Sequence, residues 1–250
     1  MDRLIYSSLA AMRGAMSRQA TIASNMANLN TVGFRGEMTQ AESLWVKEQG
    51  GQGVSSRATV RSEVTGADMT GGDVTSTGRD LDIALNGDSM IAVQAPNGDE
   101  AYTRRGDLQV DKAGVMTTGD GVPVIGDQGP ITLPPYDKLS IAKDGTISIV
   151  PQGAAATEPQ QVDRIKMVTP KGSDVRKGTD GLFRNANGGT LPDDPDASLQ
   201  SQSLESSNVS PSQVLIEMVD ASRAWDGQVK MLTTAQDLDK SSADLMRIDS

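Results

Sequence analysis

A catalytic site in this sequence would have to be built on carboxylates, because the chain contains no histidine and no cysteine. Those two absences exclude Ser-His-Asp and Cys-His nucleophilic sites, thiolate and imidazole zinc sites, and disulfide bonds. Two tight acidic clusters remain, Asp80 with Asp82 and Asp193 with Asp194 and Asp196. A pair of carboxylates is in principle sufficient for glycoside hydrolysis.

Both acidic clusters are better explained as solvated turns of an acidic chain. The formal net charge is −10 and aromatic residues make up only 3% of the sequence, so few rings are available to form a sugar platform. The Asp193 cluster lacks the spaced oxygen ligands and the terminal glutamate of a calcium loop. A nucleic-acid surface would need clustered Lys and Arg, which the sequence does not contain. We therefore expect no enzymatic activity, no metal, no cofactor and no nucleic-acid partner.

The first thirty or so residues predict one long helix. Steps of four and three residues relate Ile5, Leu9, Met12, Met16, Gln19, Ala23 and Met26, which is the spacing of a single helical stripe. A helix from Arg3 to Val32 would be about 45 Å long. Gly33 would then follow its end in a Schellman cap, with Phe34 against Leu29. Such a helix cannot cover its own apolar stripe and needs a partner.

The carboxyl end predicts a second helix with a clear start. Ser210 suits the N-cap, Pro211 suits the first helical position, and Gln213 completes a capping-box pattern. The predicted stripe runs through Leu215, Met218, Ser222, Trp225, Val229 and Leu232, and then shifts to Met231, Ala235, Leu238, Ser242 and Leu245. Gly227 lies inside this helix and should cost about 1 kcal/mol relative to alanine. No pattern in the sequence accounts for it.

Charge favours pairing of the two terminal helices. Residues 1–35 carry four arginines and one aspartate, a net charge of +3, whereas residues 205–250 carry eight acidic and four basic residues, a net charge of −4. Exposed ion pairs contribute little to stability, so opposite charge selects a partner more than it stabilises one.

The middle of the chain predicts β structure, with short apolar runs separated by glycine turns. The segments 108–116 and 139–147 align at four pairs of positions, Leu108 with Leu139, Val110 with Ile141, Lys112 with Lys143 and Gly114 with Gly145. Both segments predict hairpins in which the glycine takes the left-handed conformation. The sequence thus predicts an α+β fold. Residues 1–35 and 205–250 form terminal helices that pair as a coiled-coil-like domain, 36–77 an extended connector, and 78–204 a central all-β domain.

Asn25, Asn28 and Asn30 crowd the end of the first helix, where helix propensity does not favour asparagine. Asn25 and Asn28 lie with Thr21 on a polar stripe away from the apolar one. Two interpretations are open. The polar stripe is a solvated back face, or it is buried in an assembly where its amides bond neighbouring subunits and fix their register.

The stretch ASNMANLNTVGF near the start, together with LESSNVSPSQVLIEMVDASRAWDGQVKML near the end, resembles the bacterial flagellar axial proteins of rod and hook. The central stretch GRDLDIALNGDSMIAVQAPNGDEAYTRRGDLQVDKAG is similar to the opening of that family's β domain. The opening MDRLIYSSLAAMRGAM and the short length favour the proximal-rod member over distal-rod or hook members. Ser24 and Trp225 depart from the family pattern, in which asparagine and tyrosine are usual.

The resemblance implies a structural subunit whose paired terminal helices line the inner tube of a helical assembly, with the β domain outside. Such an assembly forms the rod that spans the periplasm, transmits torque from rotor to hook and encloses the export channel. Its implied partners are other rod subunits, further copies of this chain and the flagellar type III export apparatus. The alternatives are another axial paralogue or an unrelated secreted, adhesin-like binding module with helical stalk ends.

The implied interface follows from the motif positions and from the two stripes. The resemblance assigns to it Asn25, Asn28, Asn30, Thr31, Gly33, Phe34, Ser207, Asn208, Val209, Glu217, Met218, Arg223 and Trp225. The stripes add Ile5, Leu9, Met12, Met16, Met26, Leu215, Val229 and Leu232. No apolar run is long enough for a signal-peptide core or a membrane span, so we expect export without a cleaved signal peptide and no membrane insertion.

Overall fold

The computed structural model describes residues 2–45, 58–153, 159–170 and 175–248. The chain divides into two compact units. The helical unit comprises Met1–Ala27, Glu37–Gly66 and Ser210–Ser250, and the β unit comprises Asn28–Gly36 and Ala67–Val209. The chain therefore passes from one unit to the other four times, and neither unit is a continuous stretch of sequence.

The helical unit begins with α1 (Asp2–Ala27), which ends five residues before the predicted Val32. Beyond Ala27 the chain turns, with the Thr31 N–H bonded to the Asn28 carbonyl at 3.2 Å and the Thr31 hydroxyl donating to Asn28 Oδ1 at 3.0 Å. Short polar side chains offer the backbone such alternatives to a helix. The predicted Schellman cap at Gly33 is therefore wrong, because the helix has already ended.

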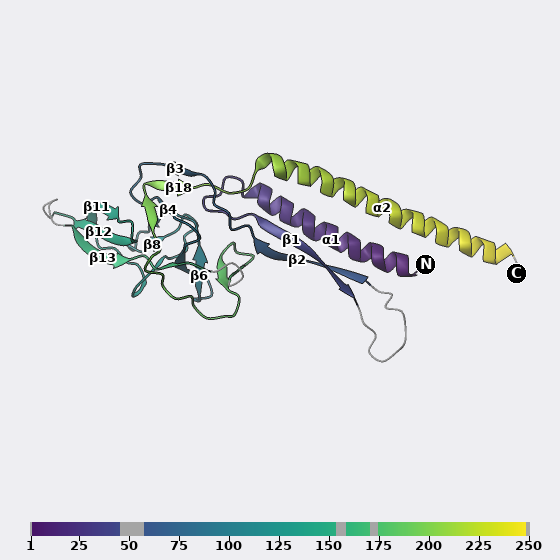
Figure 1. The fold of residues 1–250 in the computed structure, drawn as a ribbon, viewed down its shortest axis with the longest axis horizontal. Coiled ribbons are helices and arrows are strands. Elements are labelled where there is room, and N and C mark those ends of the chain that lie inside the picture. Colours follow the sequence, from purple (N-terminus) through teal and green to yellow (C-terminus); the bar gives the residue numbers. More distant parts are fainter. Residues whose placement is uncertain (1, 46–57, 154–158, 171–174, 249–250) are drawn as a thin grey trace. The chain divides into compact units, whose positions relative to one another are not determined.

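The second helix, α2 (Pro211–Ile248), starts where the sequence predicts. Its first turn is closed by the Val214 N–H, which donates to the Ser210 carbonyl at 3.0 Å. The capping box is not formed, because the Gln213 side chain donates to Glu217 Oε1 at 2.9 Å instead of reaching back to the N-cap. The helices lie side by side and run in opposite directions, and the longer α2 continues past the start of α1 (Figure 1).

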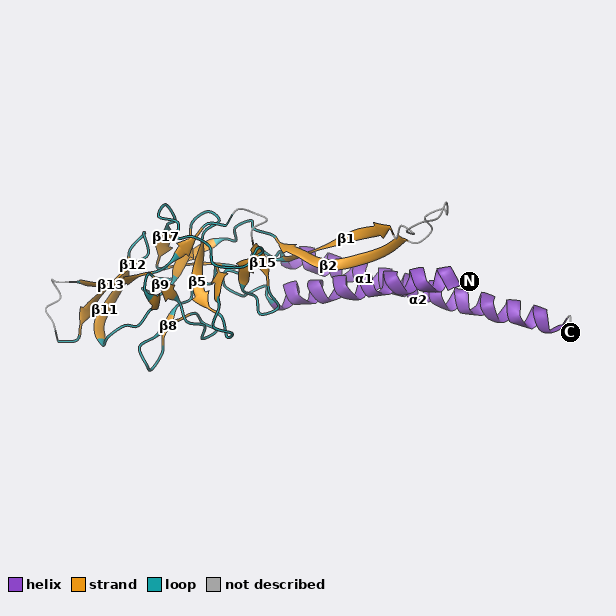
Figure 2. Cartoon of the chain, turned by 90° about the horizontal axis from the view of Figure 1, so that it is seen from below, coloured by secondary structure: helices purple, strands orange, loops and turns teal. Residues whose placement is uncertain are grey.

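A hairpin completes the helical unit. Strands β1 (Glu37–Trp45) and β2 (Ala58–Ala67) pair with each other, and β1 lies against α1 (Figures 1 and 2). These strands occupy much of the stretch 36–77, for which the sequence predicts an extended connector; residues 46–57 lie outside the description. The connector is thus in large part paired β structure that packs with a terminal helix.

The β unit contains many short strands in several small sheets. Its strands are β3 (Val74–Ser76), β4 (Ile83–Leu85), β5 (Met90–Gln94), β6 (Glu100–Thr103), β7 (Gln109–Val110), β8 (Met116–Thr117), β9 (Ile125–Gly126), β10 (Gly129–Pro130), β11 (Tyr136–Ile141), β12 (Thr146–Pro151), β13 (Gln160–Arg164), β14 (Met167–Val168), β15 (Val175–Lys177), β16 (Phe183–Asn185), β17 (Leu199–Ser201) and β18 (Ser203–Glu205). The larger sheets have the orders β14-β5-β6-β16-β15 and β11-β12-β13. Antiparallel pairs β17-β4 and β18-β3 join the two ends of this unit.

One main apolar core holds these sheets together. Among its fully buried members are Ile83, Ile91, Leu108, Met116, Ile131, Ile147 and Ile165. A second cluster on the other face of the five-stranded sheet contains Met90, Ala92, Tyr102, Val168 and Phe183. Strand β5 supplies Ile91 to the first cluster and Met90 and Ala92 to the second, as the alternation of side chains along a strand requires.

Both predicted hairpins are confirmed. β7 pairs with β8 and β11 pairs with β12. Gly114 and Gly145 have φ of 83° and 84°, in the left-handed region that favours glycine. Each glycine N–H donates across its turn, to Asp111 and Ala142 respectively.

The α+β class, with terminal helices and a central β-rich unit, is likewise confirmed (Figure 2). Among the described residues, neither helix combines the length and the apolar character needed to cross a membrane.

Truncating the core should destabilise the β unit strongly. Leu108 is completely buried, so Leu108→Ala should lower the free energy of unfolding by about 2–5 kcal/mol through lost transfer energy and the cavity left behind. Val74, which is 49% exposed in β3, provides the control, since Val74→Ala should change stability by at most about 0.5 kcal/mol. Urea unfolding followed by fluorescence compares the two. Equal effects would contradict the position assigned to Leu108.

Candidate functional site

The apolar stripe predicted on α1 is largely left open by the chain's own packing. Leu9 and Met16 are 43% and 58% exposed. Gln19 and Ala23 are also exposed, whereas Met12 and Met26 are half-buried. The side chain of Ile5 lies outside the described residues. Among the α1 side chains that the structure describes, from Ser8 onward, those buried are Ser8, Thr21, Ile22 and Asn25.

On α2, the face that packs within the chain lies one residue before the first predicted stripe at Val214 and Ala221, and it includes Ala235 of the shifted stripe, as predicted. Its most buried members are Val214, Ala221 and Ala235, spaced by multiples of seven residues. The predicted Leu215, Met218 and Val229 are 55%, 44% and 37% exposed. Trp225 and Leu232 are half-buried, Glu217 is half-buried beside Gln213, and Arg223 is exposed. The chain thus buries mainly small side chains of α2 and leaves large ones at the surface.

Together the two helices present an extensive apolar surface. Its exposed large side chains are Leu9 and Met16 on α1, and Leu215, Ile216, Met218, Val219, Val229, Met231 and Leu238 on α2. Scattered apolar residues on a surface need no explanation, but apolar groups repeated along neighbouring helices mark an interaction surface. We call this set the exposed helix surface.

Asn25 has a role that neither open interpretation expected. Its side chain is 8% exposed and bonds twice to the backbone of Glu37: Nδ2 donates to the carbonyl at 3.0 Å, and Oδ1 accepts from the N–H at 2.7 Å. The amide therefore holds the first residue of β1 against α1 within the same chain. Thr21 is also buried, with its hydroxyl donating to the Ser17 carbonyl at 3.3 Å. Asn28 is half-buried in the turn after α1, and Asn30 is exposed.

The motif residues after α1 lie in the β unit. Gly33 has φ of 64°, and a Cβ there would overlap the backbone of Arg104. Its N–H donates to the Glu205 carbonyl at 2.8 Å. The ring of the half-buried Phe34 faces Lys177, whose Nζ lies 3.6 Å from the ring centroid. Glycine is therefore required at position 33 by both conformation and close backbone contact.

Next to Gly33, three buried charges form a cluster. Arg35 Nη2 donates to Glu205 Oε1 at 2.7 Å, and Arg104 donates from Nε and Nη2 to Glu205 Oε2 at 2.9 and 2.7 Å. All three side chains are at most 2% exposed. Glu205 Oε1 also accepts from the Gly72 N–H at 2.9 Å. We call Arg35, Glu205 and Arg104 the charge cluster.

Arg104 also fixes the nearby backbone. It donates from Nη1 to the carbonyls of Gly87 and Ser89, both at 2.7 Å, and from Nη2 to the carbonyl of Leu85 at 2.8 Å. A guanidinium is suited to this arrangement because its donors lie in one rigid plane. The charge cluster therefore ties the segment that follows α1 to the loop between β4 and β5.

Asn208 performs a similar function with a neutral side chain. Its Oδ1 accepts from the Gly36 N–H at 2.8 Å, and its Nδ2 donates to the carbonyls of Asp68 and Thr70 at 2.9 and 3.0 Å. The Asn208 N–H donates to the Phe34 carbonyl at 3.3 Å. Ser207 and Val209 flank it and are half-buried. Three chain segments that lead into or out of the helical unit, at 28–36, 67–73 and 205–209, are thus joined inside the β unit, and we call this region the junction.

The electrostatics of the junction favour a charged Glu205. Burial on its own would raise the pKa of this carboxyl group, but attraction and hydrogen bonds from Arg104, the hydrogen bond from Arg35 and the Gly72 N–H outweigh it and lower the pKa. Burial and the nearby Arg35 lower the pKa of Arg104, whereas Glu205 opposes that change. The cluster is held together by the carboxylate between its two cations.

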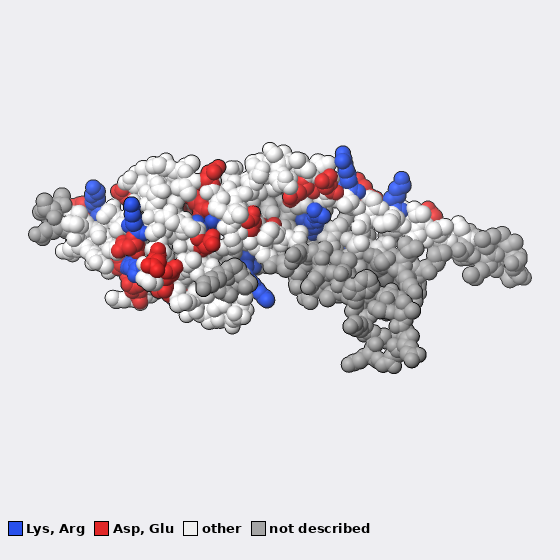
Figure 3. All heavy atoms as spheres, viewed as in Figure 1, with Lys and Arg blue, Asp and Glu red and all other residues white. Residues whose placement is uncertain are grey.

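The acidic clusters serve turns and ion pairs. Asp82 is buried, accepts from the Thr77 hydroxyl at 2.6 Å and pairs with Arg79 at 2.7 Å. Asp80 accepts from Gln202 Nε2 at 2.7 Å. On the face drawn in Figure 3, acidic side chains gather over the β unit with basic side chains beside them.

The second acidic cluster, Asp193 with Asp194 and Asp196, also uses its carboxylates to accept hydrogen bonds from the chain itself. Asp193 accepts from the Met167 N–H at 3.3 Å, and Asp194 accepts from the Asp196 N–H at 3.0 Å. Within the described part of the chain, no group of acidic side chains is placed to hold a metal ion.

Sequence reasoning did not identify the charge cluster. Arg35 directly follows the recognised Gly33–Phe34 motif, and Glu205 lies three residues before Asn208, but their partnership spans 170 residues. The signal available in the sequence was one charged residue beside each terminal motif, Arg35 after Phe34 and Glu205 before Asn208. Asn208, Gly33 and Phe34 were identified as functional, although the structure places them in the junction and not on the helix faces.

Alanine at position 33 should be tolerated less well than at another glycine with positive φ. Gly98 has φ of 87° and open space around the position of a Cβ, so Gly98→Ala pays only the conformational cost, about 1–2 kcal/mol. Gly33→Ala adds the overlap with Arg104, for about 1–3 kcal/mol more. Denaturant midpoints of the two variants provide the comparison, and equal losses would exclude the close contact.

Neutralising Glu205 should destabilise the β unit by about 3–5 kcal/mol, because Glu205→Gln leaves two buried arginines without a carboxylate. Asp120 gives a matched control. It pairs with Arg105 but is 62% exposed, so Asp120→Asn should cost no more than about 1 kcal/mol.

The same glutamate should make stability depend on pH. Because folding lowers its pKa below the usual 4.5, the folded state binds fewer protons, and the stabilisation is complete above that value and is lost as pH falls below it. Unfolding curves between pH 3 and 7 should show a smaller acid loss in Glu205→Gln than in the native chain. An identical acid loss in both proteins would remove Glu205 as its source.

Three family descriptions match separate parts of the chain. They are "Flagella basal body rod protein" over residues 5–35, "Flagellar hook protein FlgE/F/G D1 domain" over 84–149, and "Flagellar basal body rod FlgEFG protein C-terminal" over 200–245. The first and third matches include Arg35 and Glu205. The charge cluster is thus formed by residues from the two matched ends of the chain.

Relatives match the chain along almost its whole length. The flagellar basal-body rod protein FlgF of Escherichia coli is 38% identical and that of Salmonella typhimurium 37% identical, each over 243 residues and 95% of both chains. The protein of the same name from Caulobacter vibrioides is 32% identical over 253 residues and 98% of both chains. The resemblance seen in the sequence is confirmed, and the chain belongs to the FlgF family of flagellar basal-body rod proteins.

Proposed function

We propose that this chain is a structural subunit of the proximal rod, assembling helically with other rod subunits and with copies of itself. The assembly acts as the drive shaft that carries torque from rotor to hook, and it encloses the export channel. The observation that carries the proposal is the exposed helix surface. A chain that closes its β core completely leaves large apolar side chains open along both terminal helices.

The distribution of apolar residues supports assembly through the helices. Met16 is 58% exposed and Ile216 59% exposed, whereas most core side chains of the β unit are less than 5% exposed. Covering apolar surface of this extent is favourable by about 25 cal/mol for each Å² removed from water. Burial against further subunits would complete what the single chain leaves open, with α1 and α2 as a coiled-coil-like inner core.

The polar residues near the end of α1 divide between two roles in this proposal. Asn25 serves its own chain through Glu37. Asn30 is exposed, and Asn28 is half-buried in the same turn. These two, with the exposed Arg223 on α2, are candidates for contacts between subunits.

Membership of a rod-protein family supports the remaining parts of the proposal. Subunits would leave the cell body through the flagellar type III export apparatus without a cleaved signal peptide, and would act in the basal body as the part of the rod that crosses the periplasm. The role is mechanical and requires no enzymatic activity. An unrelated adhesin-like module would not account for the FlgF relatives along the whole chain.

A charge on the exposed helix surface should prevent assembly without unfolding the chain. Met16→Glu changes an already exposed side chain, so the free energy of unfolding of the isolated protein should change by no more than about 0.5 kcal/mol. In the rod the same carboxylate would be desolvated, and we expect a loss of motility and of intact basal bodies.

Val74→Glu is the matched control, because Val74 is 49% exposed but belongs to β3 of the β unit and not to a terminal helix. It should leave motility intact. Export of each variant is measured separately by the amount of subunit that leaves the cell body. Normal numbers of rods containing Met16→Glu would refute assembly through this surface.

A further inference from the structure

Methionine carries all the sulfur of this chain. The sequence contains 12 methionines and no cysteine, so the thioether is the sulfur group that an oxidant can modify. Three methionines belong to the exposed helix surface, namely Met16 on α1 and Met218 and Met231 on α2, and each of them is more than 40% exposed. We call these three the helix-surface methionines.

Apolar contact alone does not require methionine at these positions. The same surface also contains Leu9, Leu215 and Leu238, and exchanges between leucine and methionine change burial energy little. Methionine differs from leucine in two ways: its side chain is more flexible, and its sulfur can accept an oxygen atom. The second difference gives this surface a chemistry that an all-leucine surface would lack.

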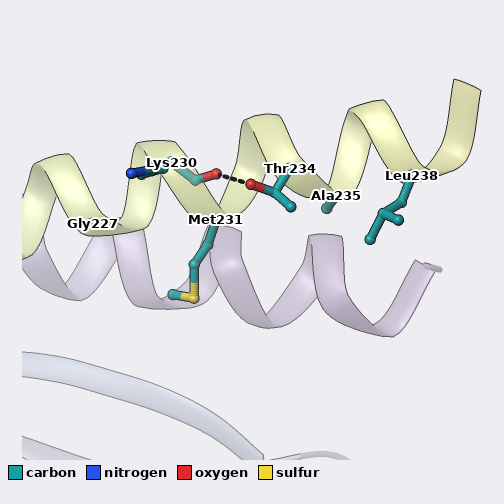
Figure 4. A pocket seen from close by; sticks show the side chains of 6 residues that line it. All are labelled: Gly227, Lys230, Met231, Thr234, Ala235 and Leu238. Atoms are coloured by element: carbon teal, nitrogen blue, oxygen red, sulfur yellow. Dashed lines mark hydrogen bonds between the residues drawn. The ribbon is translucent and has the colours of Figure 1, made fainter.

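The surroundings of Met231 leave its sulfur accessible. Met231 lines a hollow of about 360 Å³ on α2, together with Gly227 and Leu238. Figure 4 shows its thioether extending away from the α2 backbone. A small oxidant in solvent can therefore reach the sulfur atom without any opening of the fold.

Gly227 contributes to this accessibility. It lies four residues before Met231, and a helical side chain leans toward the turn that precedes it, so these positions are neighbours on the helix surface. Glycine weakens a helix interior, yet a Cβ at position 227 would meet no atom within 4 Å. Packing within the chain therefore does not require glycine here. Its effect is that no side chain covers the Met231 thioether from position 227.

Oxidation would reverse the character of these side chains. Hydrogen peroxide transfers one oxygen atom to a thioether: a sulfur–oxygen bond forms, the O–O bond breaks, sulfur loses two electrons to the peroxide, and water leaves. The product, methionine sulfoxide, is polar, and reductases that act on it restore the thioether. A sulfoxide oxygen buried in an apolar contact is an acceptor without a donor, which opposes that contact.

Resting on the proposed rod function, we propose that the helix-surface methionines are sites of reversible oxidation by peroxides, and that their oxidation withholds a subunit from the rod. The methionines of the β core differ, because Met90, Met116 and Met167 are completely buried and oxidise only when the β unit opens. A peroxide therefore changes the assembly surface while the fold of the β unit stays intact.

Peptide mapping of the isolated chain tests the chemistry. During treatment with hydrogen peroxide, mass spectrometry of tryptic peptides should show sulfoxide forming about tenfold faster at the helix-surface methionines than at Met90, Met116 and Met167. Gly227→Leu places a side chain beside the thioether and should slow oxidation of Met231 about threefold while that of Met218 is unchanged. Equal rates at buried and exposed methionines would overturn the inference, and an unchanged Met231 rate in Gly227→Leu would overturn the role assigned to Gly227.

A pair of triple variants tests the effect on assembly. Met16→Leu, Met218→Leu and Met231→Leu together keep the surface apolar and cannot be oxidised, whereas glutamine at the same three positions imitates the polar sulfoxide. Because all three side chains are exposed in the single chain, both variants should keep the denaturant midpoint of the native protein. Cells with the leucine variant should contain normal numbers of basal bodies, and cells with the glutamine variant about tenfold fewer.

A peroxide pulse on cells with the unmodified chain connects the two measurements. Chains that enter basal bodies after the pulse should contain about tenfold less sulfoxide at the helix-surface methionines than unassembled chains from the same cells. Equal sulfoxide in the two pools, or equal numbers of basal bodies with leucine and glutamine, would overturn the inference and leave the rod function standing. Absence of the unmodified chain from basal bodies would refute both.

Discussion

The sharing of one buried carboxylate by two arginines is the constraint on which the junction depends. Removing three charges from water is costly and is tolerated only when hydrogen bonds and geometry compensate. Glu205 meets that requirement with Arg35, Arg104 and the Gly72 N–H. Two Arg35 donors, Nε and Nη1, are nevertheless buried without a partner in the described part of the chain. The cluster is therefore better understood as specifying one arrangement of the chain than as adding stability.

The two units differ in how completely each buries its apolar side chains and pairs its polar groups within the chain. The β unit closes two apolar clusters and holds its incoming segments with side chain–backbone bonds from Asn208 and Arg104. The helical unit uses small side chains such as Ala221 for its internal contact and leaves larger ones open. A subunit of a filament needs this division, because apolar surface that is already buried within one copy cannot also bind the next copy.

Local rules were enough to predict some elements. Pro211 fixed the start of α2, and Gly114 and Gly145 marked two hairpins, because these signals act within a few residues. The hairpin β1–β2 was missed because its first residue is held by Asn25 through tertiary bonds. The buried face in the first half of α2, at Val214 and Ala221, was placed one residue too late because Leu215 and Met218 dominate the apolar periodicity, whereas Ala235 in the second half was placed correctly. Arg35 and Glu205 could not be paired, since no local pattern connects residues 170 positions apart.

That separation in sequence also governs when the junction can form. Its bonds span 170 residues from Arg35 to Glu205 and 172 from Gly36 to Asn208. Contacts between residues so far apart in the sequence form late in folding, because the chain loses loop-closure entropy before it gains the contact. A chain that emerges from a ribosome or a pore with its N-terminus first cannot close the junction until residue 208 has appeared. The order of folding follows from these separations in sequence. The local β hairpins form early, and the segments that lead to α1 and α2 are fixed last.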